Sequence, residues 1–218
     1  MVLAGNALSE STRDLESQSK AKYLTKDSAA GSLGAVRLLD DFLVQLAGSV
    51  DVALMPGEND PANQILPQQP LHPCLFPLAS GYPSLTTVTN PHAFEARGVR
   101  VLAFSGQNVD DVLRNTSLEC PLDALETVVR CGHMAPTCPD TVGCFPFKDS
   151  DPFVLRETPH VVLAANQARF AQRTVTLEGE GGVEVRLVAV PRFSEAGGVV
   201  RLNLRTLEAD ENVFETGL

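Results

Sequence analysis

The sequence lacks an apolar run of the length that crosses a lipid bilayer. Its start also lacks the basic segment, apolar segment and cleavage site that together mark a secretory signal. We therefore expect neither a transmembrane helix nor a signal peptide. Hydrophobic residues make up 44% of the 218 positions and charged residues 20%, which is ordinary for one globular domain or slightly more.

Basic residues are scarce and scattered. The chain has 17 lysines and arginines against 27 aspartates and glutamates, which gives a formal net charge of -10 at pH 7. A surface with this charge repels phosphate backbones. The composition therefore argues against strong intrinsic binding to nucleic acid, and any work near DNA would depend on a partner.

Closely paired cysteines are also missing. The chain has five cysteines, and none forms a Cys-x-x-Cys pair. This odd number fits a reducing compartment better than a secreted disulfide scaffold. Cys131, Cys138 and Cys144 lie within a short stretch, but their spacing is long and uneven for a structural zinc site. We favour free, partly buried thiols.

The first part of the chain predicts a strand, a helix and a second strand. Met1–Ala4 and Val50–Met55 are short apolar runs, and the segment between them contains an amphipathic helix. Such a unit implies a parallel strand pair. We place Leu33, Val36, Leu39, Phe42, Leu43 and Leu46 on the buried face of the helix, and Arg37, Asp40, Asp41 and Gln45 on its exposed face.

The rest of the chain predicts further strands and helices, and hence a mixed α/β fold. Residues 60–83 are rich in proline and form an ordered extended loop that is packed by its apolar side chains. Residues 131–153 form a second loop, rich in proline and glycine. We expect strands at Val99–Phe104, His160–Ala165, Arg173–Leu177, Val183–Val190 and Val199–Leu204. We expect helices at Asp110–Arg114 and Pro121–Arg130. Hairpin turns are expected at Gly179–Gly182 and Gly197-Gly198, and an acidic, frayed tail from Glu208.

Several motifs make the chain recognisable. They are Val2-Leu3-Ala4-Gly5-Asn6, the turn from Met55 to Pro61, Leu66-Pro67-Gln68-Gln69-Pro70-Leu71-His72-Pro73-Cys74, Ser105-Gly106-Gln107-Asn108-Val109-Asp110-Asp111, and His133-Met134-Ala135-Pro136-Thr137 running to Pro139-Asp140-Thr141. Together they resemble the calcineurin-like phosphodiesterase domain of the small subunits of B-family DNA polymerases. The segment Leu66–Pro73 is similar to the delta branch of that family.

The resemblance implies an αββα phosphoesterase sandwich, a β-sandwich flanked by helices. It also implies that the first strand of this fold and the oligonucleotide-binding (OB) domain before it lie upstream of the sequence, so that the chain is the carboxyl-terminal part of a longer product. We divide the sequence into an inactivated phosphodiesterase-like domain, residues 1–207, and an acidic tail, residues 208–218.

By the same resemblance, the metal-binding motifs of active phosphoesterases are degenerate here. Asn6 replaces an aspartate, Glu58 and Asn59 replace an asparagine and a histidine, Ser105 stands in place of a lone histidine, and Asn166 and Ala168 replace the two histidines of Gly-His-x-His. Asp60 alone keeps its residue type, and it is at least as well suited to capping a turn as to binding a metal ion. We therefore expect no catalytic residue, no metal and no cofactor.

The four histidines fit this expectation, because His72, His92, His133 and His160 have no metal-ligand spacing. We expect local hydrogen-bonding roles, with His133 at the end of a helix. No nucleophile elbow surrounds Ser105, and Gly179–Gly182 precedes a strand, which is unlike a phosphate-binding loop.

The resemblance implies a non-catalytic scaffold of a nuclear replicative polymerase, with roles in DNA replication and repair. Its implied partners are the cysteine-rich carboxyl-terminal domain of the delta catalytic subunit and a third accessory subunit. DNA would be reached only through the complex, and no membrane is involved. Two alternatives stay open: a divergent metal-dependent phosphoesterase, and a decayed, non-functional fragment.

Overall fold

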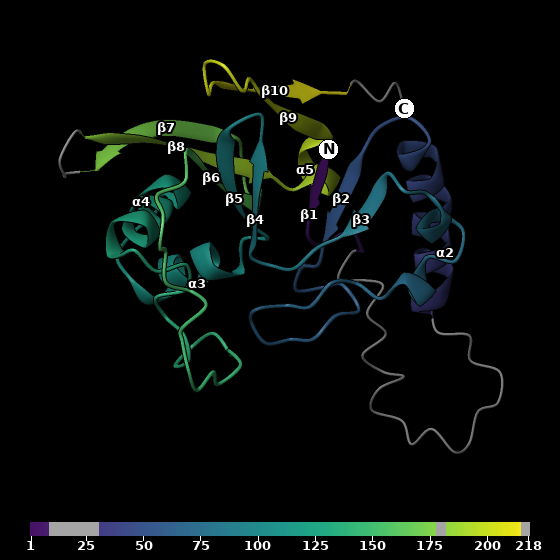
Figure 1. Ribbon diagram of the computed structural model, residues 1–218, viewed down its shortest axis with the longest axis horizontal. Helices are drawn as coiled ribbons and strands as arrows, with labels where there is room; N and C mark the ends of the chain where they lie inside the picture. The colour runs from purple at the N-terminus through teal and green to yellow at the C-terminus, as the bar shows by residue number, and fades with distance from the viewer. Residues whose placement is uncertain (9–30, 178–181, 215–218) are drawn as a thin grey trace. The chain divides into compact units, whose positions relative to one another are not determined.

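A computed structural model describes residues 1–8, 31–177 and 182–214 of the chain (Figure 1). It contains both helices and strands, and the strands form parallel and antiparallel pairs, so the predicted mixed α/β class is confirmed. The chain divides into two compact units. The first unit comprises residues 1–62 and 69–89, and the second comprises residues 63–68 and 90–218. Within the described ranges, no helix combines the length and the apolar character that a membrane span requires.

The first unit contains a three-stranded parallel sheet in the order β1-β2-β3. Its strands are β1 (Val2–Ala4), β2 (Val52–Met55) and β3 (Leu85–Thr87). Helix α2 (Gly31–Ala47) connects the first two strands, and Leu3 pairs with Leu54 in parallel register. The predicted strand–helix–strand unit is therefore confirmed, whereas β3 is an additional strand that the sequence patterns did not indicate.

The buried face of α2 differs from the prediction. Leu43 is fully buried as expected, but Leu33 and Phe42 are about half exposed, at 47% and 48%. Asp40, which we placed on the solvent face, is buried. Its carboxylate accepts hydrogen bonds from the backbone amides of Leu78, at 3.1 Å, and Ala79, at 2.8 Å. These backbone donors compensate the burial of the charge, which is why the helix turns this position inward.

The proline-rich segment 60–83 is ordered, as predicted. It contains the short 3-10 helices η2 (Pro73–Leu75) and η3 (Ala79–Gly81) and no strand. Leu71 and Phe76 are buried with Leu43 and Leu54 in the core of the first unit, so the expected packing of this loop is confirmed for these side chains. Leu78 is an exception, since it is 58% exposed.

The second unit is built on a five-stranded mixed sheet in the order β4-β5-β6-β8-β7. Its strands are β4 (His92–Ala96), β5 (Val99–Phe104), β6 (Val161–Gln167), β7 (Ala171–Leu177) and β8 (Val183–Pro191). The predicted strands are present, and β7 pairs antiparallel with β8 as expected. The Gly179–Gly182 turn falls largely on residues 178–181, outside the described residues. Strand β4 was not predicted.

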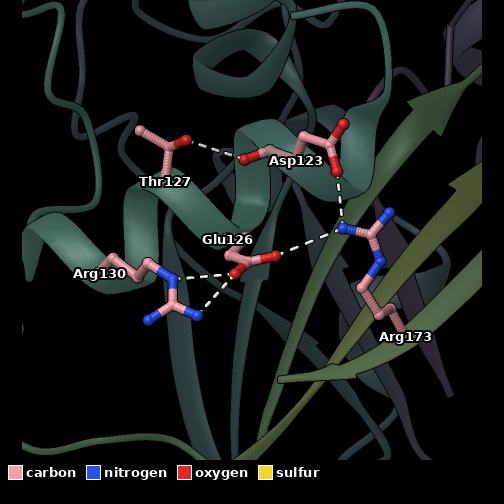
Figure 2. A network of polar contacts seen from close by, with 5 residues as sticks. All are labelled: Asp123, Glu126, Thr127, Arg130 and Arg173. Carbon is pink, nitrogen blue, oxygen red and sulfur yellow. Dashed lines mark hydrogen bonds and ion pairs between the residues drawn. The ribbon is translucent and has the colours of Figure 1, made fainter. Parts of the chain in front are cut away.

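Helices α3 (Gln107–Asn115) and α4 (Pro121–Cys131) cover one face of this sheet (Figure 1). The apolar side of α4 faces the sheet through Leu122, Leu125, Val128 and Val129, as predicted. Its polar side meets Arg173 of β7, whose guanidinium contacts Asp123 at 2.6 Å and Glu126 at 3.3 Å, while Arg130 binds Glu126 from the same helix (Figure 2).

The other face of the sheet is covered by a two-stranded hairpin of β9 (Gly198–Leu202) and β10 (Ala209–Val213). Two expectations are wrong here. Gly197 does not form a hairpin turn, because it ends the short helix α5 (Phe193–Ala196) with φ 61. Residues 209–213 are not frayed, because they pair with β9, and the side-chain amide of Gln172 bonds both backbone groups of Ala209. The sandwich arrangement and the division at residue 207 stay predictions.

Candidate functional site

The loops that follow β1 and β2 pack closely against each other. Gly5 and Asn6 continue β1 with positive φ angles of 81 and 54. Gly57 follows β2, and a Cβ atom at this position would lie 2.3 Å from the backbone nitrogen of Asn6. Only glycine leaves room for this approach. The two loops that carry the expected metal-binding positions are thus in direct backbone contact.

Asp60 is 2% exposed and joins these loops through its carboxylate. The carboxylate accepts hydrogen bonds from the backbone amides of Gly57, at 2.8 Å, Leu8, at 2.9 Å, and Ala7, at 3.3 Å. Burial raises the pKa of Asp60, and the backbone amides around it offset part of that rise. Both carboxylate oxygens are engaged, so the side chain stabilises the loops.

The neighbouring positions complete this arrangement. The side-chain oxygen of Asn6 accepts a hydrogen bond from the backbone amide of Asn59 at 2.9 Å. Glu58 is exposed, and Asn59 is partly buried. The structure therefore brings Asn6, Asn59 and Asp60 together through hydrogen bonds that involve backbone amides. A divalent ion would compete with these bonds for the same oxygens.

The second group of expected positions lies at the ends of β5 and β6, in the second unit. The side-chain amide of Asn166 donates a hydrogen bond to the backbone oxygen of Ser105 at 2.8 Å. Asn166 has a φ of 60 and lies at an irregularity in the pairing of β6 with β8. Ala168 is exposed just beyond β6. Ser105 and Asn166 are thus joined, and Ala168 contributes no polar side chain.

Gly106 fixes the approach of these two strand ends. Its φ is 110, and a Cβ atom there would lie 2.3 Å from the backbone oxygen of Ala165. The backbone after β5 therefore passes directly over β6.

A cluster of neutral polar side chains surrounds Ser105, and the sequence patterns did not indicate it. The side-chain nitrogen of Asn90 lies 2.7 Å from the oxygens of both Gln68 and Ser105, and 2.9 Å from the oxygen of Gln107. Gln68, Asn90 and Ser105 are all buried. Gln68 falls within the motif Leu66–Cys74, and this motif was the sequence feature that could have indicated the cluster. Amides and a hydroxyl group bring no negative charge to balance a divalent ion.

The histidines have the local roles that we expected for three of them. His72 accepts a hydrogen bond from the amide of Cys74, and His160 accepts one from the amide of Arg100. His133 follows the end of α4 and accepts a hydrogen bond from the amide of Ala135. Its ring also lies 2.9 Å from the carboxylate of Asp151, and this hydrogen bond holds the pKa of Asp151 below its usual value. His92 stacks on Phe94, and burial lowers the pKa of His92.

The cysteines are free thiols in the structure. Burial raises the pKa of Cys138 to about 12, and Cys144 adds to that rise. In the described part of the chain, no three His, Cys, Asp or Glu side chains are grouped so that they could hold a metal ion. The residues at the strand ends therefore do not fit the two-metal centre of active phosphoesterases, which needs carboxylate and imidazole ligands.

Residues 1–172 match the family model that describes the B subunit of DNA polymerases alpha and epsilon. The chain is 41% identical over 216 residues to the DNA polymerase delta small subunit of Arabidopsis thaliana, covering 99% of this chain and 48% of that protein. It is 46% identical over 184 residues to DNA polymerase delta subunit 2 of Drosophila melanogaster, covering 84% of this chain and 42% of that protein. The chain thus spans about half the length of the curated relatives it matches.

Proposed function

The chain belongs to the family of B subunits of DNA polymerases alpha and epsilon, and from this we propose that it is a non-catalytic accessory subunit of DNA polymerase delta. Its role would be to support DNA replication and repair in the nucleus. The names of the relatives support the assignment to DNA polymerase delta. The residues at the strand ends of this chain support a non-catalytic role.

The observation that carries the non-catalytic part is the environment of Asp60. Asp60 is the one degenerate position that keeps the residue type of active phosphoesterases, yet its two carboxylate oxygens accept hydrogen bonds from three backbone amides. Ser105 and Asn166 are likewise engaged in hydrogen bonds at the other strand ends. Interactions that join loops stabilise a surface, and a rigid surface loses little entropy when a partner docks on it.

In this proposal the chain is a scaffold. It would hold the cysteine-rich carboxyl-terminal domain of the polymerase delta catalytic subunit and a third accessory subunit, within an inactivated phosphoesterase sandwich. The net charge of -10 supports a division of labour in which other subunits contact DNA. No membrane takes part.

Co-expression with the cysteine-rich domain of the catalytic subunit tests the scaffold role. We expect the full 218-residue chain and that domain to elute together in size-exclusion chromatography. Circular dichroism and thermal melting of the chain alone provide the control for folding. A folded chain that elutes separately from the domain contradicts the scaffold role, whereas a chain with no cooperative melting favours the decayed fragment.

The remaining alternative is a divergent metal-dependent phosphoesterase. Among the degenerate positions, Glu58 is the one exposed carboxylate, and no imidazole accompanies it. A single carboxylate falls short of the ligand set that a two-metal centre needs. Incubation of the chain with manganese and a chromogenic phosphodiester distinguishes the two functions, because only the enzyme would release the chromophore in proportion to the protein present.

A further inference from the structure

An open cavity of about 640 Å³ lies between two turns of the second unit. Arg97, Asn203, Leu204 and Arg205 line it. Arg97 belongs to the turn between β4 and β5, and the other three residues belong to the turn between β9 and β10 (Figure 1). None of the degenerate metal positions lines this cavity, so the proposed function leaves it without a role.

The turn that carries Arg97 is a tight hairpin. Ala96 pairs with Val99, which leaves Arg97 and Gly98 as the two central residues, with φ angles of 51 and 81. Two positive φ angles define the type I′ turn, in which asparagine, aspartate and glycine are the favoured residues. An arginine in the first position is therefore not explained by the needs of the turn.

The second turn is held in place by Asn203. Its backbone oxygen accepts a hydrogen bond from the amide of Leu207, and its side-chain oxygen accepts one from the amide of Arg205 at 2.9 Å. With that oxygen engaged, the side chain of Asn203 presents its NH₂ group as the donor. Arg205 is exposed at the tip of a turn whose backbone is fixed.

Neither arginine has a carboxylate partner within the described residues. Some other arginines of this unit do have one: Arg173 contacts Asp123 and Glu126 (Figure 2), and Arg201 of the same hairpin contacts Asp210. Acidic residues outnumber basic ones in this chain. Two arginines that line one cavity without such a partner leave local positive charge there, and a bound anion would offset it.

We propose that this cavity binds a phosphate group, with Arg97 and Arg205 as its charged ligands and Asn203 as an additional donor. The polar lining side chains offer hydrogen-bond donors, and the planar guanidinium fork matches two oxygens of a phosphate. The strongly acidic chain disfavours a long polyanion such as DNA. The ligand is therefore a small phosphate compound, either a free phosphate or pyrophosphate or the phosphate of a nucleotide.

Isothermal titration calorimetry of the full chain tests this site, with inorganic phosphate, pyrophosphate and a nucleoside triphosphate as separate probes. Arg97→Asn removes one guanidinium and places a favoured residue in the turn, so the hairpin is preserved. Arg205→Gln removes the other. We expect each variant to weaken binding by about tenfold or more, the loss of one charge-assisted contact. The ratio between the three probes identifies the source of the phosphate.

Arg156→Gln is the matched control, because Arg156 is exposed, has no ion pair in the described part of the chain and does not line the cavity. It should bind each probe as the unmodified chain does. The proposal is overturned if millimolar phosphate compounds do not bind, if the two variants bind as tightly as the unmodified chain, or if the control loses as much affinity as they do. Binding of an acidic peptide in the absence of phosphate binding would also overturn it.

Discussion

The carboxylate of Asp60 accepts a hydrogen bond from the backbone amide of Leu8, 2.9 Å away and 52 positions earlier in the sequence. This bond joins the loop after β2 to the loop after β1. In an active phosphoesterase of the family that the sequence resembles, these loops would present ligands to a metal ion. Here hydrogen bonds to Asp60 join the two loops, and the aspartate has a structural role.

Replacement of Asp60 by alanine should lower the free energy of unfolding by about 3 kcal/mol or more, because it leaves several buried backbone amides without an acceptor. Urea unfolding followed by circular dichroism measures this change. Glu58→Ala is the control: Glu58 is two positions earlier and exposed, so its removal should change stability by no more than about 0.5 kcal/mol. Equal effects of the two substitutions would contradict the structural role of Asp60.

The stabilising effect of Asp60 should also depend on pH. Since burial raises its pKa in the folded state above the ordinary 3.8, the folded protein retains this proton to higher pH than the unfolded protein does. Stability from this group is therefore complete below the unfolded pKa and falls as the pH rises through the folded pKa. Asp60→Asn cannot titrate and provides the reference.

The difference in unfolding free energy between the unmodified chain and Asp60→Asn should thus decrease from about pH 4 towards neutral pH. Urea titrations of both proteins at several pH values measure it. A difference that increases with pH would show that the backbone amides lower this pKa more than burial raises it.

Asp40 should be a second structural aspartate. It is 3% exposed, and its carboxylate accepts from two backbone amides of the proline-rich loop. Asp40→Ala should cost about 1–3 kcal/mol and increase proteolysis within residues 69–83. Asp41→Ala, on the exposed side of the same helix, should leave both stability and cleavage unchanged. The same stability for the two variants would argue against the inward orientation of Asp40.

Gly106→Ala should be far more harmful than Gly98→Ala. Both glycines have a positive φ, which costs an L-residue about 1–2 kcal/mol. An added methyl group at Gly106 also meets the backbone oxygen of Ala165, whereas at Gly98 it meets nothing within 4 Å. Thermal melting of the two variants isolates the effect of this contact. Similar melting temperatures would contradict the close approach of the two strand ends.

The sequence was most informative where periodicity or apolar content is strong. Strand β5 has the predicted bounds, Val99–Phe104, because its apolar run is continuous and ends at Ser105-Gly106. The inward positions of α4 follow from three- and four-residue spacing behind Pro121. The parallel pairing of β1 with β2 follows from the helix between them.

Elements that depend on distant partners were missed or misplaced. Strand β10 is acidic along Ala209–Val213, and it forms because β9 and the side chain of Gln172 supply its hydrogen-bond partners. Asp40 was assigned to solvent because its donors lie 38 and 39 positions later in the sequence. Three residues of β3 carry no pattern of their own, and β2 provides the pairing.

The candidate site was predictable in its residue types and not in its contacts. The resemblance predicts that Asn6, Glu58, Asn59, Ser105, Asn166 and Ala168 differ from the residues that bind metal at these positions in active phosphoesterases. They did not reveal that Gln68 and Asn90 form a neutral network with Ser105, because those residues come from separate loops that meet only in the fold.

Titration of the full chain with manganese(II), followed by electron paramagnetic resonance, tests most directly whether the strand ends form a metal centre. Since Asp60 and Asn166 are held by backbone groups, we predict that manganese remains free in solution at micromolar concentrations, and that Asn166→Ala gives the same spectrum as the unmodified chain. Stoichiometric binding of a pair of ions, lost in Asn166→Ala while that variant stays folded, would contradict this account.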